Sequence, residues 1–306
     1  MNGVLVVDKP VGITSQIVIS ATRRVTGERR VGHCGTLDPL ASGVLPVMVG
    51  KATKACEFLM DHEKTYTASV RLGVTTDSED ITGQVLTTYD GPLPSFAAFR
   101  AAAESFIGEI EQVPPMYSAL KQNGQKLVDL ARQGITVERA PRKVTIHAIR
   151  AYEQDGAYLL DVHCSRGTYI RTLCAEIGRV LGCGACMNSL RRTSVGQFTL
   201  AQSIPLDTLR TYSQQQAEEA LIPLEHLFSH LPEVTLPPFF ARLYGNGERI
   251  ALEKLRSVFP QANPQANPQA GGKGQLYRVY TPDGRLTLGE ATKWNGNPVF
   301  SAKIFF

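Results

Sequence analysis

The chain lacks the features that mark membrane-spanning and fibrous proteins. None of its apolar runs approaches the roughly 18 residues that a transmembrane helix needs. Hydrophobic residues make up 43% and charged residues 20% of its 306 residues, which is ordinary for a globular protein of about two domains. The first ten residues, MNGVLVVDKP, contain neither a basic leader nor a small-residue cleavage site. The sequence therefore predicts a cytoplasmic protein that does not associate with membranes.

The chain also lacks a strong excess of charge of either sign. Lys and Arg total 32 against 28 for Asp and Glu, and the formal net charge of +4 is too small to establish an anionic partner. The arginines nonetheless gather in short clusters at 23–30, 139–142 and 191–192, which together could follow a phosphate backbone. Solvated helix faces and turns explain these clusters equally well, so charge alone leaves nucleic-acid binding open.

Cysteine is scarce, and its spacing does not suit a disulfide framework or a metal site. The six cysteines occur without a secretory signal, so reduced thiols are expected. Cys183 and Cys186 form a single CxxC motif. A structural zinc site needs a second ligand pair at matching spacing, and Cys174 and His163 do not supply it. No metal site is expected.

Hydrophobic periodicity predicts alternating strands and helices over the first 230 residues. The stretch GVLVV at 3–7 is typical of a buried strand, and Val18, Ala21 and Val25 recur at helical spacing before Gly27, a typical helix end. The further expected strands are 44–50, 66–72 and 160–164, and the further expected helices are 51–61, 95–112 and 173–181.

Two later segments differ from this pattern. The stretch 114–143 carries several basic side chains around a short helix closed by Gly134, which predicts a basic flap on the edge of the sheet. Beyond a boundary near 232–238, short strands and tight turns predict a small β domain at 236–306. Inside it, the QANP repeat at about 260–274 is too rich in Pro, Gly and Gln to build a core, so a disordered loop is expected.

The run HCGTLDPLASG at 33–43 is the most informative in the sequence. Two glycines and one proline in eleven residues predict an irregular backbone, and Pro39 favours an extended conformation at Asp38. A carboxylate on a rigid loop is well placed for nucleophilic or acid–base chemistry. An isolated Asp-Pro pair more often only caps a turn, so the run by itself leaves both roles open.

This run resembles the catalytic motif of the TruB-type tRNA pseudouridine synthases, GHxGTLDPxAxG, in which the aspartate is essential. Cys34 stands where that family more often has Thr or Gly, and Ser42 where Thr is common; both are small residues. The resemblance covers residues 3–230, and residues 236–306 more weakly resemble the PUA domain, an RNA-binding domain. Five further stretches follow in the order that the family shows: DKPVGITS at 8–15, KTYTASVRLGVTTDSEDITG at 64–83, VPPMYSALKQNGQKLVDLARQGI at 113–135, CSRGTYIRTL at 164–173 and LRRTSVGQF at 190–198.

The resemblance implies an α+β fold and a cofactor-free isomerase. Residues 1–231 would form a mixed, mainly antiparallel sheet flanked by helices, followed by a small all-β PUA-like domain. The enzyme would convert uridine to pseudouridine at position 55, in the T-loop of tRNA, after flipping the base out of the loop. Two alternatives stay open: a non-catalytic tRNA-binding or tRNA-folding chaperone, and the catalytic subunit of a guide-RNA particle. The latter would need docking extensions around the C-terminal domain, and none is clear, so a monomer without guide RNA is expected.

The resemblance also assigns residues to the reacting uridine. Asp38 would act on the sugar, either by attacking C1′, as in a retaining glycosidase, or by removing a C2′ proton to give a glycal. The planar guanidinium of Arg171 would hold Asp38 in one orientation and keep it ionised. Tyr66 would stack on the uracil and is a candidate for moving the C5 proton, and Tyr169 and Leu190 would pack around the flipped nucleotide.

Further residues would contact the rest of the RNA. His33 would lie against the loop bases that remain after flipping, and Asp80 would belong to the active-site network. Lys121, Arg191 and Arg192 would supply phosphate contacts that position the RNA without reading its sequence. Taken one at a time, such histidines, leucines and arginines are more often structural, and only the match to the family favours these roles.

Overall fold

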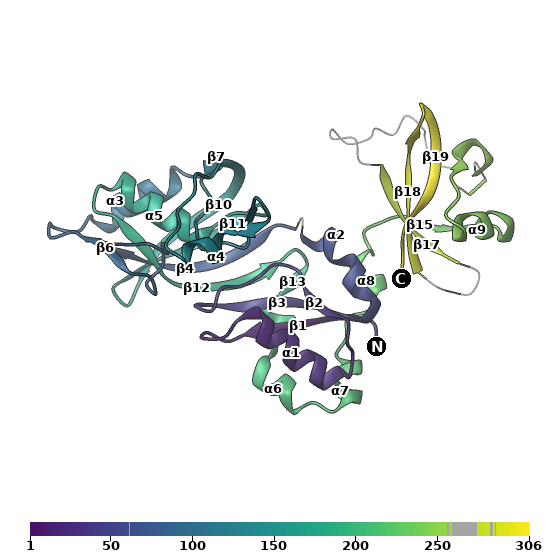
Figure 1. Ribbon diagram of the computed structural model, residues 1–306, viewed down its shortest axis with the longest axis horizontal. Coiled ribbons are helices and arrows are strands. Elements are labelled where there is room, and N and C mark those ends of the chain that lie inside the picture. The colour runs from purple at the N-terminus through teal and green to yellow at the C-terminus, as the bar shows by residue number, and fades with distance from the viewer. Residues whose placement is uncertain (61, 256, 259–273, 282–283, 285) are drawn as a thin grey trace.

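The computed structural model (Figure 1) describes residues 1–60, 62–255, 257–258, 274–281, 284 and 286–306. The QANP insertion, expected at about 260–274, therefore lies outside the described residues except for Gly274. None of the described helices combines the length and the apolar character that crossing a bilayer requires.

The first 49 residues form three strands and one helix around the loop that carries Asp38. Strand β1 (Gly3–Lys9) is followed by helix α1 (Ser15–Thr26), strand β2 (Val31–His33) and strand β3 (Ala41–Val49). Gly27 ends α1 in the left-handed conformation at φ 69°, as the sequence predicts. Both β1 and β2 pair antiparallel with β3.

A ten-stranded sheet organises the larger part of the molecule. Its main path runs β14–β1–β3–β12–β4–β11–β10–β7, with β2 and β13 attached at the side. Strand β1 pairs parallel with β14, and β3 pairs parallel with β12, whereas the other pairings are antiparallel. The predicted mixed, mainly antiparallel sheet is confirmed. The strands not yet introduced are β4 (Lys64–Leu72), β7 (Gly108–Gln112), β10 (Arg142–Gln154), β11 (Ala157–Cys164), β12 (Ala185–Val195), β13 (Phe198–Thr199) and β14 (Ile204–Pro205).

Side chains of this sheet alternate between two apolar cores. In β1, Leu5 and Val7 belong to the core shared with α1, whereas Val4 and Val6 belong to a second core. All nine residues of β3 are buried, because this strand has apolar layers on both faces. Three further helices contribute to the first core: α3 (Phe96–Glu104), α5 (Ile170–Val180) and α6 (Leu206–Thr211).

Two helix predictions need correction. The helix expected over 95–112 ends at Glu104, and Gly108–Gln112 is instead strand β7, which pairs with β10 at the edge of the sheet. Gly108 adopts φ 119°, which a helix does not accommodate. The helical spacing of apolar residues therefore continues past the point where the helix has ended. The helix expected at 51–61 is a 3₁₀ segment (Gly50–Ala55) followed by the short helix α2 (Cys56–Met60).

The flap predicted at 114–143 follows the edge strand β7. It contains the two-residue strands β8 (Lys121–Gln122) and β9 (Gln125–Lys126) and then helix α4 (Leu127–Ala131). Met116, Leu127 and Leu130 form its own small apolar cluster. The flap therefore has a packed centre and can hold its basic side chains in defined positions. A second small hairpin, of β5 (Val74–Thr76) and β6 (Val85–Thr88), precedes α3.

The C-terminal part forms a separate five-stranded sheet, in the order β15–β17–β18–β19–β16. Asn295 and Gly296, both at positive φ, form the predicted tight turn between β18 and β19. Helix α9 (Pro238–Gly245), which the sequence did not predict, packs Tyr244 against Phe300 of this sheet. The bounds of these strands are β15 (Glu233–Thr235), β16 (Ile250–Ala251), β17 (Gln275–Tyr280), β18 (Leu286–Trp294) and β19 (Asn297–Phe305).

The two sheets share apolar contacts. Leu286, Leu288 and Phe306 belong to the same core as Met48 of β3 and Phe228, which follows helix α8 (Leu224–Leu227). The C-terminal part is therefore packed against the larger sheet, although Figure 1 shows it as a distinct lobe. The assignment of residues 236–306 as a PUA-like RNA-binding domain stays a prediction.

Candidate active site

The loop between β2 and β3, residues 34–40, is fixed by buried polar groups of the N-terminal unit. Ser15 Oγ accepts a hydrogen bond from Leu37 N at 2.9 Å and donates one to Leu37 O at 3.0 Å. Lys9 is fully buried, and its Nζ donates to the carbonyl of Ile13 at 2.8 Å and lies 3.5 Å from that of Pro39. These contacts fix the backbone on both sides of Asp38.

Arg192 of β12 holds the two ends of the same loop. Its guanidinium is buried, and Nη2 donates to Gly35 O at 3.1 Å while Nε donates to Val44 O at 2.8 Å. Gly43 lies at φ 102°, and a Cβ there would overlap the carbonyl oxygen of Arg192. Only glycine allows β3 to approach β12 at this point.

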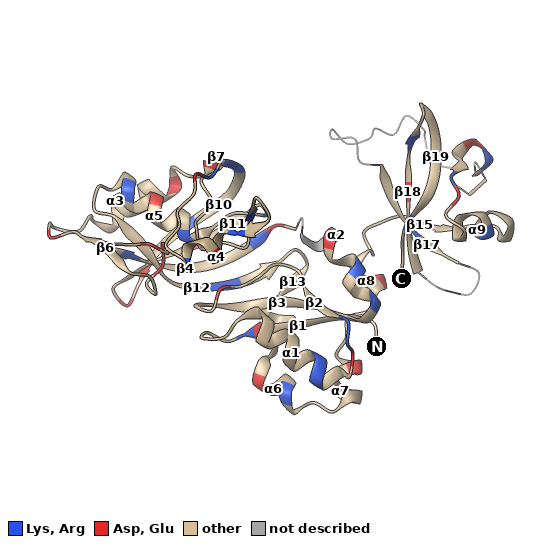
Figure 2. Ribbon diagram, viewed as in Figure 1, with Lys and Arg blue, Asp and Glu red and all other residues tan. Residues whose placement is uncertain are grey.

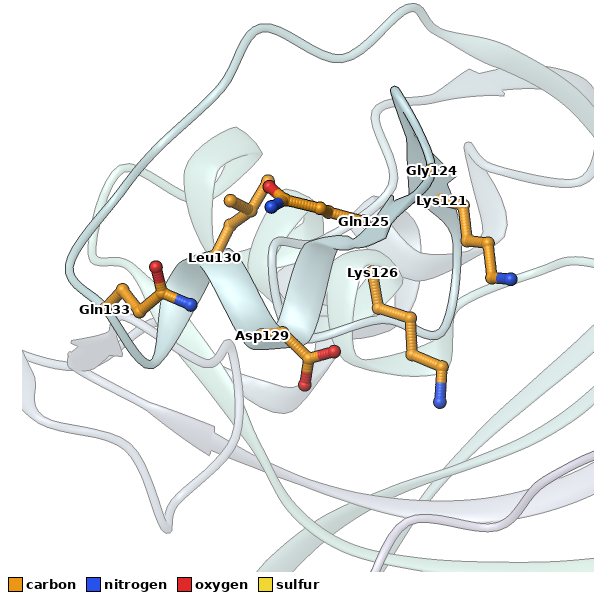
Figure 3. Close-up of a pocket in the computed structure, with 7 residues that line it drawn as sticks. All are labelled: Lys121, Gly124, Gln125, Lys126, Asp129, Leu130 and Gln133. Carbon is orange, nitrogen blue, oxygen red and sulfur yellow. The ribbon is translucent and has the colours of Figure 1, made fainter.

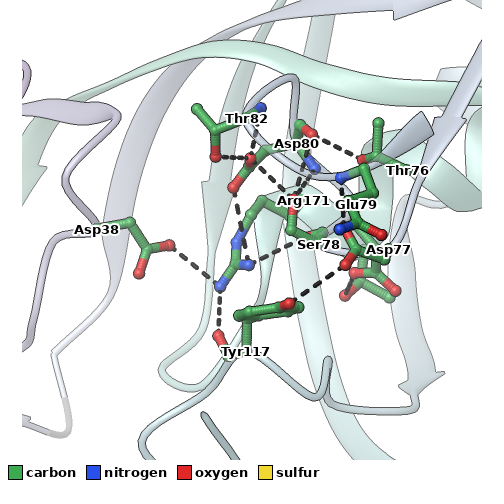
Figure 4. Close-up of polar contacts among 11 residues, drawn as sticks. Asp38, Thr76, Asp77, Ser78, Glu79, Asp80, Thr82, Tyr117 and Arg171 are labelled. Atoms are coloured by element: carbon green, nitrogen blue, oxygen red, sulfur yellow. Dashed lines mark hydrogen bonds and ion pairs between the residues drawn. The ribbon is translucent and has the colours of Figure 1, made fainter. Parts of the chain in front are cut away.

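Asp38 faces the buried guanidinium of Arg171 (Figure 4). Arg171 Nη2 lies 3.1 Å from Asp38 Oδ2, and the two side chains are 6% and 41% exposed. The carboxylate is therefore open to a substrate while its cation is not. The guanidinium does not hold Asp38 with both nitrogens, because Nη2 also donates to Tyr117 O at 2.8 Å and Nη1 donates to Ser78 O at 3.0 Å.

Asp80 approaches the same guanidinium from another side (Figure 4). Its carboxylate is buried, and Oδ2 lies 3.8 Å from Arg171 Nη1. Its Oδ1 accepts hydrogen bonds from Ser78 Oγ at 3.0 Å and from Thr82 N at 2.9 Å. Since Asp80 is already satisfied by these neutral donors, it orients Arg171 without removing that cation from Asp38.

A pocket of about 560 Å³ opens beside Asp38, within the size range of small-molecule sites. Five of the residues predicted from the sequence line it together: Asp38, Tyr66, Tyr169, Leu190 and Arg171. The flap closes one side through Tyr117, Ser118, Ala119, Lys126 and Val128. Lys64, Tyr117 and Arg192 also line this pocket; no sequence pattern predicts the first two here, and Arg192 was expected to contact phosphate instead.

Burial controls the protonation of several groups around the pocket. It raises the pKa of Tyr66, although the neighbouring Arg192 opposes the shift, so Tyr66 is a neutral phenol at pH 7. It also lowers the pKa of Lys9 to about 8, against the attraction of Asp38. Burial lowers the pKa of Lys64 as well, and the charge of Arg192 adds to that effect.

The phosphate role expected for Arg192 is wrong. Its side chain is 1% exposed and extends into the protein, so it cannot reach an RNA backbone. Neighbouring residues of a strand point to opposite faces, and Arg191 accordingly remains partly exposed. The sequence shows two adjacent arginines, and only the strand pairing separates the structural one from the accessible one.

Besides Asp80, three predicted residues lie outside this pocket. His33 is half-buried in β2, and burial lowers the pKa of its imidazole. Arg191 forms an ion pair with Asp8 at 2.6 Å and contacts Ser42 Oγ at 3.3 Å. Lys121 lines a separate hollow of about 340 Å³ on the flap (Figure 3), next to Lys126, which reaches both pockets.

Metal-ligating side chains are not grouped near this site. In the described parts of the chain, no three His, Cys, Asp or Glu side chains are arranged to hold a metal ion. The six cysteines are free thiols.

Comparison with known proteins relates this geometry to a family. The model of the TruB family pseudouridylate synthase N-terminal domain matches residues 23–170, and that of the tRNA pseudouridylate synthase B C-terminal domain matches residues 171–229. A tRNA pseudouridine synthase B of Burkholderia mallei is 44% identical over 300 residues, covering 97% of this chain and 94% of the relative. The same enzyme of Clostridium acetobutylicum is 42% identical over 295 residues and covers 96% of both chains.

Solved structures agree with this relationship. A chain of a Cbf5-Nop10-Gar1 complex superposes with a TM-score of 0.70 at 30% identity, covering 99% of this chain and 85% of that one. A chain of an H/ACA RNP bound to a substrate RNA containing 2′-deoxyuridine superposes with a TM-score of 0.67 at 26% identity and the same coverage. The chain therefore belongs to the TruB family of tRNA pseudouridine synthases, which are isomerases.

Proposed function

We propose that this enzyme isomerises uridine 55 in the T-loop of tRNA, without a cofactor, and that Asp38 is the reacting carboxylate. One observation carries the proposal: an accessible carboxylate on a fixed loop faces a pocket and lies 3.1 Å from a buried guanidinium. The reaction breaks the N1–C1′ bond, turns the uracil and joins C5 to C1′. No atom is gained or lost, so the protein has to supply only charge, proton transfer and positioning.

Asp38 supplies the charge on the sugar side. As C1′ becomes electron-poor, a carboxylate can attack it, or it can remove a C2′ proton so that a glycal forms. Both routes require Asp38 as a carboxylate. The Arg171 guanidinium lies 3.1 Å from that carboxylate and can orient it, and Asp80 keeps the guanidinium in place.

Tyr66 acts on the base. Its buried ring can stack on the uracil, and its phenol is the group that we assign to the C5 proton. Burial disfavours the phenolate by raising the pKa of Tyr66, whereas the Arg192 charge next to it acts in the opposite direction. Arg192 would therefore ease loss of the Tyr66 proton, so that the phenolate that accepts the C5 proton forms more readily than burial alone allows.

The uridine has to leave the RNA stack before it enters the pocket, at a cost of roughly a few kcal/mol in lost stacking. Tyr169 and Leu190 would pack around the everted nucleotide, since both line the pocket. His33 would contact the bases that remain in the loop. Its pKa is lowered by burial, so it would act as a neutral imidazole that stacks and forms hydrogen bonds.

Phosphate contacts would come from the flap and from the C-terminal lobe. Lys121 and Lys126 are exposed basic side chains on the flap, and Lys126 reaches the rim of the pocket. Basic and acidic residues are interspersed over both sheets (Figure 2), which favours recognition of RNA shape over binding by one strongly positive face. The predicted PUA-like domain at 236–306 would reach toward the acceptor arm.

An RNA isomerisation assay tests this function. The purified chain is incubated with an unmodified T-arm stem-loop, with no guide RNA or other protein added, and pseudouridine is mapped in the product. Pseudouridine at position 55 is expected, and a stem-loop with cytidine at that position serves as the control substrate. Tight binding without product would favour the tRNA-folding chaperone, and product only after addition of a guide RNA would favour the particle subunit.

A further inference from the structure

Two thiols meet at the base of the loop 34–40, which carries Asp38 and is called the reactive loop for its proposed role. Cys34 Sγ and Cys56 Sγ lie 2.8 Å apart and share a hydrogen bond. Cys34 follows β2 and directly precedes Gly35, whereas Cys56 is the first residue of α2. The contact therefore joins the reactive loop to an element that takes no part in the proposed chemistry.

The surroundings of the two sulfur atoms differ. Cys34 is fully buried, and its backbone N donates to Pro46 O at 3.2 Å. Cys56 is only half-buried, so it is the more exposed residue of the pair. The Cys56 thiol also contacts His33 O at 3.6 Å, which keeps it directed toward the loop. The pair therefore joins one partly exposed residue to one that is fully buried.

The pKa values of the two thiols are shifted in opposite directions, and the lowered one belongs to the more exposed Cys56. The hydrogen bond from Cys34 lowers the pKa of the Cys56 thiol, against the effect of burial. The same bond, together with burial, raises the pKa of Cys34. Because the thiolate is the nucleophile in sulfur chemistry, Cys56 is the group that reacts first with an electrophile.

We propose that Cys34 and Cys56 form a reversible modification site, which a hydroperoxide converts into a disulfide that constrains the reactive loop. In the first step the Cys56 thiolate attacks the peroxide, an S–O bond forms, the O–O bond breaks, and the hydroxide that leaves takes up the proton Cys56 has lost. In the second step the Cys34 sulfur displaces that hydroxyl group, so that an S–S bond forms and the S–O bond breaks. The two thiols together lose two electrons and two protons, and one hydrogen peroxide becomes two waters.

The two sulfur atoms already lie close to bonding distance. An S–S bond is about 2.05 Å long, so the two sulfur atoms approach each other by roughly 0.8 Å. That displacement acts on Gly35, whose carbonyl is bound by Arg192, and through it on Asp38 four residues from Cys34. Because small misplacements of a reacting group are costly, turnover is expected to fall when the disulfide forms. This effect on turnover rests on the proposed function, whereas formation of the disulfide does not.

Disulfide mapping tests the site independently of activity. The reduced full chain is treated with equimolar hydrogen peroxide, its remaining thiols are alkylated, and its peptides are analysed by mass spectrometry. We expect two of the six thiols to be lost, a cross-linked pair of peptides containing Cys34 and Cys56, and recovery of all six thiols with dithiothreitol. Six alkylated cysteines, oxidation of Cys56 to a sulfinic acid without a cross-link, or a disulfide between Cys183 and Cys186 would each overturn the proposal.

Two variants separate this pair from general oxidation. Cys56→Ser, at a half-buried position, should form no disulfide and should keep its turnover after peroxide treatment. Cys183→Ser removes a thiol from the CxxC motif and should cross-link as the wild type does. Oxidised wild type is expected to turn over T-arm RNA roughly tenfold more slowly than the reduced form. Unchanged turnover of a fully cross-linked protein would overturn the constraint on the loop.

Discussion

At the scale of single residues, the site is built around one cation between two carboxylates. Arg171 lies 3.1 Å from Asp38 and 3.8 Å from Asp80, yet only Asp38 is accessible. Asp80 accepts hydrogen bonds from neutral donors, so its charge is stabilised locally and the guanidinium is left to Asp38. The different exposure of the two carboxylates is the reason why we propose Asp38 as the reacting group and Asp80 as the positioning one.

Asp38→Asn removes the carboxylate and keeps the shape of the side chain. We expect conversion of uridine to be abolished while affinity for tRNA stays within about tenfold, because RNA binding depends mainly on phosphate contacts. Single-turnover pseudouridine mapping and a filter-binding titration measure the two quantities. Asp207→Asn, at a side chain 84% exposed, is the matched control and should leave both unchanged. Retained turnover in Asp38→Asn would remove Asp38 from the chemistry.

Arg171→Lys tests whether a positive charge beside Asp38 is sufficient for turnover, without the shape of the guanidinium. The guanidinium contacts Ser78 O, Tyr117 O and Asp38 at the same time, and a lysine ammonium cannot reach all three positions. Loss of one charge-assisted hydrogen bond predicts a fall in kcat of roughly 10- to 100-fold. Circular dichroism shows whether the variant folds, and Arg179→Lys, on the same helix with a side chain 72% exposed, is the control. Near-normal rates in Arg171→Lys would mean that charge alone is enough.

At the scale of elements, the reactive loop depends on strand pairing that occurs elsewhere in the chain. Strand β3 begins directly after the loop and pairs parallel with β12 from Leu190 to Arg192. The same part of β12 brings Leu190 into the pocket and Arg192 under the loop. Residues about 150 positions apart in the sequence are therefore fixed relative to each other by one parallel pairing.

Gly43→Ala tests this pairing. The added Cβ overlaps the Arg192 carbonyl at a positive φ, so we expect a loss of unfolding free energy greater than the strain of about 1–2 kcal/mol that a left-handed alanine alone causes. Gly156→Ala is the matched control, because Gly156 also has a positive φ (74°) but no neighbour within 4 Å. Urea denaturation compares the two variants. Equal losses would mean that the close approach of β3 and β12 contributes nothing.

At the scale of the whole molecule, the two lobes are joined by an apolar core. Phe306 stacks on Phe228 with ring centroids 5.7 Å apart, and Lys54 donates to Phe305 O at 2.7 Å. The C-terminal sheet is thereby held against the 3₁₀ segment and β3, near the thiol pair and on the side of the large sheet opposite α1. RNA contacts made by this lobe would then act on a body that is continuous with the active site.

Deletion of 236–306 tests the contribution of this lobe. We expect weaker tRNA binding, a smaller effect on chemistry at saturating RNA, and a lower melting temperature, because the apolar side chains around Phe228 become exposed. Phe306→Ala is the matched variant: it loosens the same core, at a cost of up to about 3–5 kcal/mol, and keeps the rest of the lobe in place. A deletion that slows chemistry more than it weakens binding would place this lobe in the active site.

The sequence by itself determined several local elements, and its resemblance to a family singled out the loop that carries Asp38. Strand β1, helix α1 with its end at Gly27, and the turn at Asn295 and Gly296 follow from periodicity and from residues that permit a positive φ. The segment 95–112 was predicted wrongly, because helical spacing of apolar residues persists beyond the helix end at Glu104, and only pairing with β10 makes Gly108–Gln112 a strand.

The tertiary structure decided which polar side chains share a site. The pairing of β12 with β3 buries Arg192 and leaves Arg191 accessible, which no local pattern distinguishes in two adjacent arginines. The contacts between Arg171 and Asp38, and between Cys34 and Cys56, are likewise made across the fold. Propensity and periodicity act over a few residues, whereas charge, burial and sulfur chemistry depend on distances that only the packed chain defines.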